Sequence, residues 1–124
     1  MKLSHVGIVA NDIESLRYWY MRYFALSSSP KYRSDERGVS CYFLSWPDSD
    51  GAQIEILSYD DRTVDPSVHQ VAIATGSREG VKFLTELLRT DGNLIVTEPA
   101  ETMTGTYMSA CLDPEGNRVE IVDR

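Results

Sequence analysis

Two segments carry the same arrangement of residues: LDPEGNRVEIVDR at 112–124 and SWPDSDGAQIEILSY at 45–59. Each has an Asp-x-x-Gly turn signal and then a strand-like run in which one glutamate stands between aliphatic residues. These glutamates, Glu55 and Glu120, are 65 positions apart. Self-similarity at a fixed spacing is the signature of a structural unit that is built more than once. The two segments therefore predict a fold that occurs twice in the chain.

Further residues keep the spacing or nearly keep it. Gly51 corresponds to Gly116, and the only two histidines, His5 and His69, are 64 positions apart, each opening an aliphatic run. Between the halves lies YDDRTVDP, an acidic, proline-containing stretch that is typical of an exposed connector. At 124 residues the chain has the length of one ordinary domain. We predict a single domain over 1–124, made of repeat modules at about 1–60 and 66–124.

Each half has the pattern of a strand, an amphipathic helix and three further strands. Apolar residues at i, i+3, i+4 and i+7 spacing predict helices over 12–25 and 77–91. Asn11 with Glu14 resembles a capping box, Ser77 is a second candidate N-cap, and Gly92 is typical of the residue after a helix. The fold class predicted is α+β, with two tandem βαβββ modules. The strands are expected over 3–10, 28–33, 38–46 and 52–58, and over 67–75, 94–98, 106–112 and 117–123.

Side-chain alternation along each strand assigns the faces of the two sheets. Ile54 and Ile56 are expected in the core, as are Val119 and Ile121, which turns Glu55 and Glu120 to the opposite face. His5 likewise opposes Val6 and Ile8 in the first strand. The fifth strand follows the pattern less clearly, because His69 shares its face with Val71 and Ile73. By the duplication, His5, Glu55, His69 and Glu120 are nevertheless predicted to line one concave surface.

These four residue types suit a divalent metal ion. Imidazole nitrogens and carboxylate oxygens bind Zn or Ni, and also Co, Mn or Fe, and two carboxylates would balance the charge of the dication. A lone glutamate in an alternating strand is more often only the polar face of a half-exposed sheet. Both glutamates are at equivalent repeat positions, however, and the histidines nearly so, which favours a metal site over coincidence.

The composition restricts the class of partner. The net charge of −7 and a pI of about 4.7 argue against nucleic acid or an anionic membrane as the main partner and leave a small molecule. Cys41 and Cys111 are too few for a disulfide scaffold. The N-terminal stretch has the pattern of neither a signal peptide nor a membrane span, so a cytoplasmic location is expected.

The chain resembles the vicinal oxygen chelate superfamily, which includes glyoxalase I, thiol transferases, extradiol dioxygenases and bleomycin-binding proteins. The resemblance extends over essentially the whole sequence. It is carried by HVGIVANDIESLRYWYMRYFAL at 5–26, QIEIL at 53–57, HQVAIAT at 69–75 and DPEGNRVEIV at 113–122, the last being the most specific. It implies paired βαβββ modules around a metal, commonly in a homodimer.

Within that superfamily, a full His/Glu/His/Glu set resembles glyoxalase I, which isomerises the hemithioacetal of methylglyoxal and glutathione. The resemblance implies that His5, Glu55, His69 and Glu120 hold the metal, with Glu120 as the catalytic base and Glu55 on the other side of the substrate. Two alternatives remain. One is a related thiol transferase or dioxygenase, which would lack a ligand at Glu55, and the other is a non-catalytic small-molecule binder.

Two positions depart from the glyoxalase pattern. Small bacterial glyoxalases commonly have an arginine four residues after the first histidine and an asparagine four residues after the first glutamate, and both contact glutathione. This chain has Val9 and Tyr59 there. The resemblance therefore implies the metal centre more directly than it implies the thiol.

Overall fold

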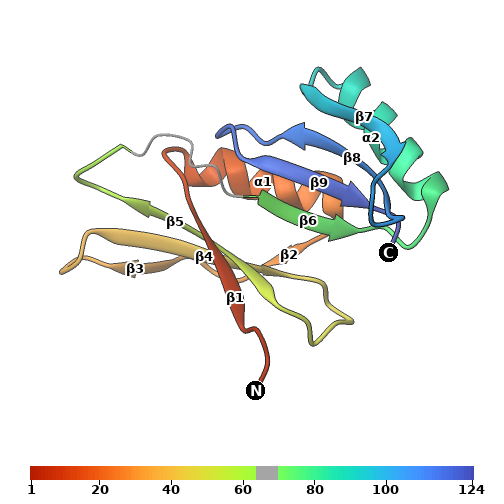
Figure 1. Ribbon diagram of the computed structural model, residues 1–124. Helices are drawn as coiled ribbons and strands as arrows, with labels where there is room; N and C mark the ends of the chain where they lie inside the picture. The colour runs from red at the N-terminus through yellow and green to blue at the C-terminus, as the bar shows by residue number, and fades with distance from the viewer. Residues whose placement is uncertain (64–69) are drawn as a thin grey trace. The chain divides into compact units, whose positions relative to one another are not determined.

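The computed structural model describes residues 1–63 and 70–124, and the chain divides into two compact units, Met1–Asp65 and Pro66–Arg124. We describe each unit by itself. Figure 1 shows the order of the elements along the chain. The predicted α+β class with two βαβββ modules is confirmed, because each unit has one helix between its first strand and an antiparallel set of later strands.

Unit 1 has one sheet in the order β1-β5-β4-β2, with β3 also pairing β4. β1 runs parallel to β5, and the remaining pairs are antiparallel. The strand predicted over 28–33 is two short strands, since Pro30 between them has no N–H to donate. The elements are β1 (His5–Val9), α1 (Ile13–Phe24), β2 (Ser27–Ser28), β3 (Tyr32–Ser34), β4 (Val39–Ser45) and β5 (Gln53–Tyr59).

Unit 2 repeats this plan with four strands in the order β6-β9-β8-β7. β6 is parallel to β9, and the β9–β8 and β8–β7 pairs are antiparallel. The β7–β8 pairing shifts register twice, between Ile95 and Thr97 and between Thr97 and Ala100. The elements are β6 (Gln70–Ala74), α2 (Arg78–Thr90), β7 (Ile95–Glu101), β8 (Tyr107–Leu112) and β9 (Arg118–Val122). Residues 67–69 of the predicted fifth strand lie outside the described part.

The helices begin and end within one residue of their predicted limits, but one cap differs. Asp12, and not Asn11, is the N-cap of α1, and its side chain accepts a hydrogen bond from the Ser15 N–H at 3.0 Å. The Ser77 cap of α2 is confirmed, as is Gly92 directly after the C-cap, where φ is 91°. In the described residues neither helix is long and apolar enough to cross a membrane.

Each sheet buries one face under its helix. In unit 1, Ile54 and Ile56 are buried with residues of α1 such as Leu16 and Tyr20, and α1 contacts β2, β4 and β5. In unit 2, Val119 and Ile121 are fully buried, and α2 contacts β7, β8 and β9. The predicted core residues of both glutamate strands are therefore correct. We call the opposite face of each sheet its helix-distal face; by alternation Glu55 and Glu120 belong to these faces.

Candidate metal centre

The first half of the predicted ligand set comes together in unit 1. β1 and β5 are parallel, and their register places Gly7 opposite Glu55 and His5 opposite Gln53. The glycine has no side chain to fill the space beside the carboxylate, so the imidazole reaches across the two strands. His5 Nε2 lies 3.3 Å from Glu55 Oε2. The sequence prediction that these two residues share a surface agrees with this contact.

Neighbouring groups orient the His5 ring. Ser4 Oγ lies 3.0 Å from His5 Nδ1, and the Phe43 ring meets the imidazole edge to face with centroids 5.6 Å apart. When Nδ1–H donates to the serine oxygen, the lone pair of Nε2 is left to bind a metal. Phe43 on β4 is the register partner of Glu55 on β5. The β4–β5 pair therefore carries the Glu55 carboxylate and also the ring that packs against the His5 imidazole.

The spacing of the two donors fits a bound metal ion. Two ligands that each lie about 2.1 Å from a tetrahedral metal are roughly 3.4 Å apart. The observed 3.3 Å between His5 Nε2 and Glu55 Oε2 agrees with this value. Both side chains are partly exposed, at 40% and 22%, so an ion can reach them.

Glu120 is at the equivalent place in unit 2. Its register partner on β6 is Ala72, another small residue, as Gly7 is for Glu55. The Glu120 side chain is 20% exposed, which matches Glu55 closely. Its Oε1 lies 3.5 Å from Arg118 Nη2, and the same nitrogen donates to Thr97 Oγ1 at 3.2 Å. The repeat is thus preserved in the position of the carboxylate, although its neighbour is a guanidinium instead of an imidazole.

The residue equivalent to His5 in unit 2 is Gln70. His5 pairs with Gln53, and Gln70 pairs with Arg118. Gln70 is 65 positions after His5 and Arg118 is 65 positions after Gln53, the same spacing as between the glutamates. Gln70 is exposed, and Ile73, on the other face of β6, is buried. His69 lies outside the described residues, so the structure places only three of the four predicted ligands.

His69 and not Gln70 is the counterpart of His5 predicted from the sequence, because histidine is the more familiar metal ligand. The signal was available, however, since the spacing of 65 that relates the glutamates leads from His5 to Gln70 and passes His69 by one residue. Within residues 1–63 and 70–124, no group of three or more His, Cys, Asp or Glu side chains is close enough to hold a metal ion.

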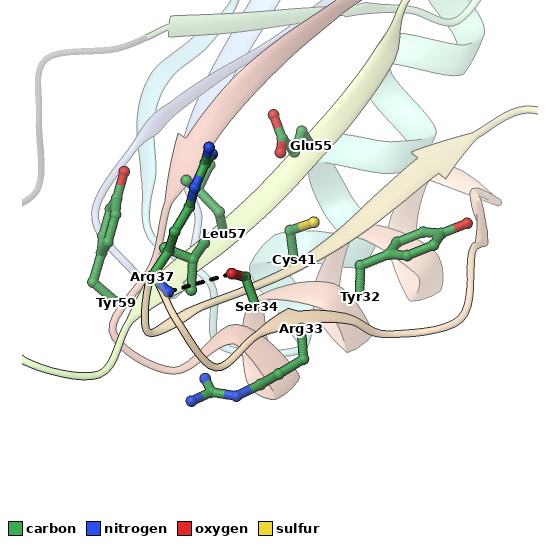
Figure 2. Close-up of a pocket in the computed structure, with 9 residues that line it drawn as sticks. Tyr32, Arg33, Ser34, Arg37, Cys41, Glu55, Leu57 and Tyr59 are labelled. Carbon is green, nitrogen blue, oxygen red and sulfur yellow. Dashed lines mark hydrogen bonds between the residues drawn. The ribbon is translucent and has the colours of Figure 1, made fainter.

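A pocket of about 570 Å³ opens on the helix-distal face of unit 1. Glu55, Leu57 and Tyr59 of β5 line it together with Cys41 of β4 and the β3–β4 hairpin, as Figure 2 shows. Burial, followed by the charge of the adjacent Glu55 carboxylate, raises the pKa of the Cys41 thiol. This thiol therefore remains protonated at neutral pH, as a weak donor beside the carboxylate.

Unit 2 has a corresponding pocket of about 350 Å³. Glu120 and Val122 of β9 line it, with Met108 of β8 and the turn after β7. Arg124 is also part of its wall and donates to Thr106 Oγ1 through Nε and Nη2, at 3.2 and 3.0 Å. In each unit, a glutamate carboxylate thus lines a pocket.

Solved structures with the same fold include several glyoxalases. Maize glyoxalase I superposes with a TM-score of 0.80 and 21% identity over 99% of this chain, which spans only 44% of the maize chain. The trypanothione-dependent glyoxalase I of Leishmania major gives 0.78 and 20%, covering 99% of this chain and 86% of its own. A glyoxalase/bleomycin resistance protein/dioxygenase domain from Frankia sp. gives 0.81 and 20%, covering 98% and 96%. At these identities the likeness shows the fold alone.

The comparison with curated proteins gave no match. One family model does match the sequence, and it covers residues 2–121, nearly the whole chain, including both glutamate strands. With the two βαβββ units and this match together, the chain belongs to the Glyoxalase/Bleomycin resistance protein/Dioxygenase superfamily.

Proposed function

We propose that this protein is a metal-dependent lyase or isomerase of the glyoxalase I type, which acts on a thiol hemithioacetal or a similar α-oxo compound. The observation that carries the proposal is the His5–Glu55 pair, whose 3.3 Å spacing suits two ligands of one metal ion. Glu120, at the repeat-equivalent position, supplies the second carboxylate. The ligands proposed from unit 1 and those proposed from unit 2 meet either within one chain or across two chains of a homodimer. Light scattering gives the oligomeric state.

The residues of the chain divide the chemistry between them. A divalent ion, Zn or Ni in the first instance, would supply the electrophile that stabilises negative charge developing on the substrate oxygens. Glu120 removes the proton from the carbon next to the carbonyl and holds it on a carboxylate oxygen. Glu55 lies on the other side of the substrate and orients it. Proton return to the neighbouring carbon completes an isomerisation that needs no oxidant.

Glu55 also separates this proposal from related chemistries. Thiol transferases and extradiol dioxygenases of the superfamily, by resemblance, use two histidines and one glutamate. A carboxylate at 55, in contact with His5, favours the glyoxalase type. A non-catalytic binder would hold its ligand after metal removal, and retention of ligand in the presence of a chelator distinguishes that case.

Substitution of Glu120 tests the assignment of the base. Glu120→Gln is expected to keep the bound metal and to lower kcat by about 10²- to 10⁴-fold, the usual contribution of a positioned general base. Metal content is measured by native mass spectrometry, and activity by isomerisation of methylglyoxal hemithioacetals of several thiols. A protein that binds no divalent metal after reconstitution, or a variant with normal turnover, contradicts the proposal.

The fourth ligand is tested with two neighbouring variants. His69 is the ligand proposed from the sequence, and the β6–β9 register favours Gln70 as the equivalent of His5. His69→Ala and Gln70→Ala are compared for metal affinity by competition with a chromogenic chelator. Loss of a ligand is expected to weaken binding at least tenfold, whereas the neighbouring substitution leaves it nearly unchanged. Equal, small effects in both variants would exclude a ligand from this segment.

A further inference from the structure

We propose that Arg37 is a specificity-determining residue, which binds a carboxylate on the substrate at the end of the unit 1 pocket away from Glu55. The inference rests on the proposed function only in assuming that a thiol adduct reacts beside Glu55. The position differs from both glutathione-contact positions considered above, Val9 and Tyr59, because Arg37 belongs to the turn between β3 and β4.

The first argument is the direction of the side chain. Figure 2 shows that Arg37, Tyr59 and Glu55 extend to the same side of the sheet, whereas Arg33 points the other way. Arg37 also lines the pocket, and its backbone N–H is bound to Ser34 Oγ at 3.3 Å, which fixes the base of the side chain in the turn. The guanidinium is therefore presented to the pocket and not to the back of the hairpin.

The second argument is the difference between two neighbouring arginines. Arg33 Nη1 donates to Asp60 Oδ1 at 2.7 Å and Arg33 Nε to Asp35 Oδ1 at 3.1 Å, so its charge is compensated within the protein. Arg37 has no hydrogen-bond or ion-pair partner for its guanidinium among the residues that the structure describes. Of the two cations of this hairpin, the one that faces the pocket is the one left available to an anion.

The third argument concerns the class of anion. The guanidinium of Arg37 matches a carboxylate, which it binds with two parallel N–H···O bonds, whereas the nearby Arg62 already lies over the Tyr59 ring, 3.9 Å from its centroid. A phosphate dianion, which carries about twice the charge of a carboxylate, is a poorer match for a chain with a net charge of −7. A carboxylate on the thiol portion of an adduct therefore suits the site best.

The span of the pocket gives an upper limit to the length of the thiol portion. Glu55 and Tyr59 are four residues apart on one strand, which separates their Cα atoms by roughly 13 Å. Arg37 is two residues before Val39, the register partner of Tyr59, and its long side chain extends into the pocket. A compact thiol acid such as 3-mercaptopropionate is thus a suitable probe of the site.

Binding is tested without any turnover, on metal-free protein. The probes are 3-(methylthio)propionate and its neutral analogue 3-(methylthio)propan-1-ol, and the readout is the Nε–Hε NMR signal of Arg37. We expect this signal to shift with the acid only, and Arg37→Gln to weaken binding of the acid about two- to fivefold, the effect of one ion pair at an exposed site. Arg37→Lys is expected to recover part of the affinity, because it keeps the charge without the paired donors.

Arg22→Gln is the matched control, because Arg22 lies on α1, against the other face of the sheet. Equal loss of acid binding in Arg22→Gln and Arg37→Gln, or equal binding of acid and alcohol, overturns the inference. Turnover is then measured with methylglyoxal adducts of 3-mercaptopropionate and 3-mercaptopropan-1-ol. A preference for the acid in kcat/KM that disappears in Arg37→Gln supports the inference.

The two proposals fail separately. If the acid binds at Arg37 but no adduct is turned over, the carboxylate site is supported and the glyoxalase function is wrong. If adducts are turned over without regard to charge, and the Arg37 signal does not respond to the acid, the function is supported and the carboxylate site is wrong.

Discussion

The Tyr42 hydroxyl connects the sheet of unit 1 to the first turn of its helix. It donates to the Glu14 carboxylate, with oxygens at 2.8 and 2.9 Å, and the Tyr42 residue is 7% exposed. This hydrogen bond is the main cause that lowers the pKa of Glu14, followed by the bond from Lys31. Burial, and then the bond to Glu14, raises the pKa of Tyr42. The contact is thus strongest when the tyrosine is protonated and the glutamate is ionised.

Tyr42→Phe tests this contact. We expect a loss of about 0.5–1 kcal/mol in the free energy of unfolding at pH 7, because Glu14 is partly exposed and keeps Lys31. A lowered acid pKa contributes stability that is lost as pH falls below the ordinary value of 4.5. A raised tyrosine pKa contributes stability that is lost as pH rises above 10.0.

The difference between wild type and variant should therefore be largest near neutral pH and shrink towards both extremes. Urea denaturation at pH 3.5, 7 and 10.5 measures it. A difference that stays constant across this range would show that the loss does not come from the hydrogen bond between the hydroxyl group and the ionised Glu14.

The proposed ligand residues show what the sequence could predict at this scale and what it could not. Alternation alone placed Glu55 and Glu120 opposite the buried Ile56 and Ile121. It could not decide the β6 position, because two adjacent polar residues, His69 and Gln70, precede the first aliphatic residue of the strand. A one-residue difference reverses the face of a strand residue, and only the pairing of Gln70 with Arg118 reveals the register.

At the scale of elements, the N-cap of α1 gives a direct test. Asp12→Ala removes the acceptor for the Ser15 N–H and is expected to destabilise the protein by about 1 kcal/mol. Asp12→Asn is the matched control, because its side-chain oxygen still caps the helix, and it should cost much less. Thermal unfolding followed by circular dichroism compares the two. Equal destabilisation would mean that the charge, acting on the helix dipole, matters more than the hydrogen bond.

The elements themselves and the limits of both helices were largely predictable, but the capping residue of α1 and the break between β2 and β3 were not. Helical periodicity identified α1 and α2, because an apolar stripe is the part of a helix that the core requires. The choice between Asn11 and Asp12 depends on the backbone angles of the entering chain, on which two good capping residues give no information. The break between β2 and β3 follows from Pro30, a signal that the prediction of one strand over 28–33 did not use.

For the whole molecule, binding of the proposed metal would stabilise the folded state. A ligand that binds only the folded state stabilises it by about 2.7 kcal/mol at a free concentration of 100 times Kd. For a chain of this length we expect a rise in Tm of roughly 8–12 °C with Zn or Ni, reversed by a chelator.

Glu55→Ala should abolish most of that rise. Glu36→Ala is the matched control, since it also removes one carboxylate from unit 1, from the exposed turn between β3 and β4. Differential scanning calorimetry with and without metal measures the effect. A metal-dependent rise that persists in Glu55→Ala would place the ion elsewhere.

The path of β7 has a consequence for the behaviour of the protein at high concentration. Among the residues that the structure describes, β7 pairs only with β8, and it contains Pro99 and shifts register twice along its length. A regular edge strand offers its free N–H and C=O groups to a strand of another molecule, which is the first step of fibril growth. The proline and the irregular pairing interrupt that row of groups, so this edge is a poor template for self-assembly.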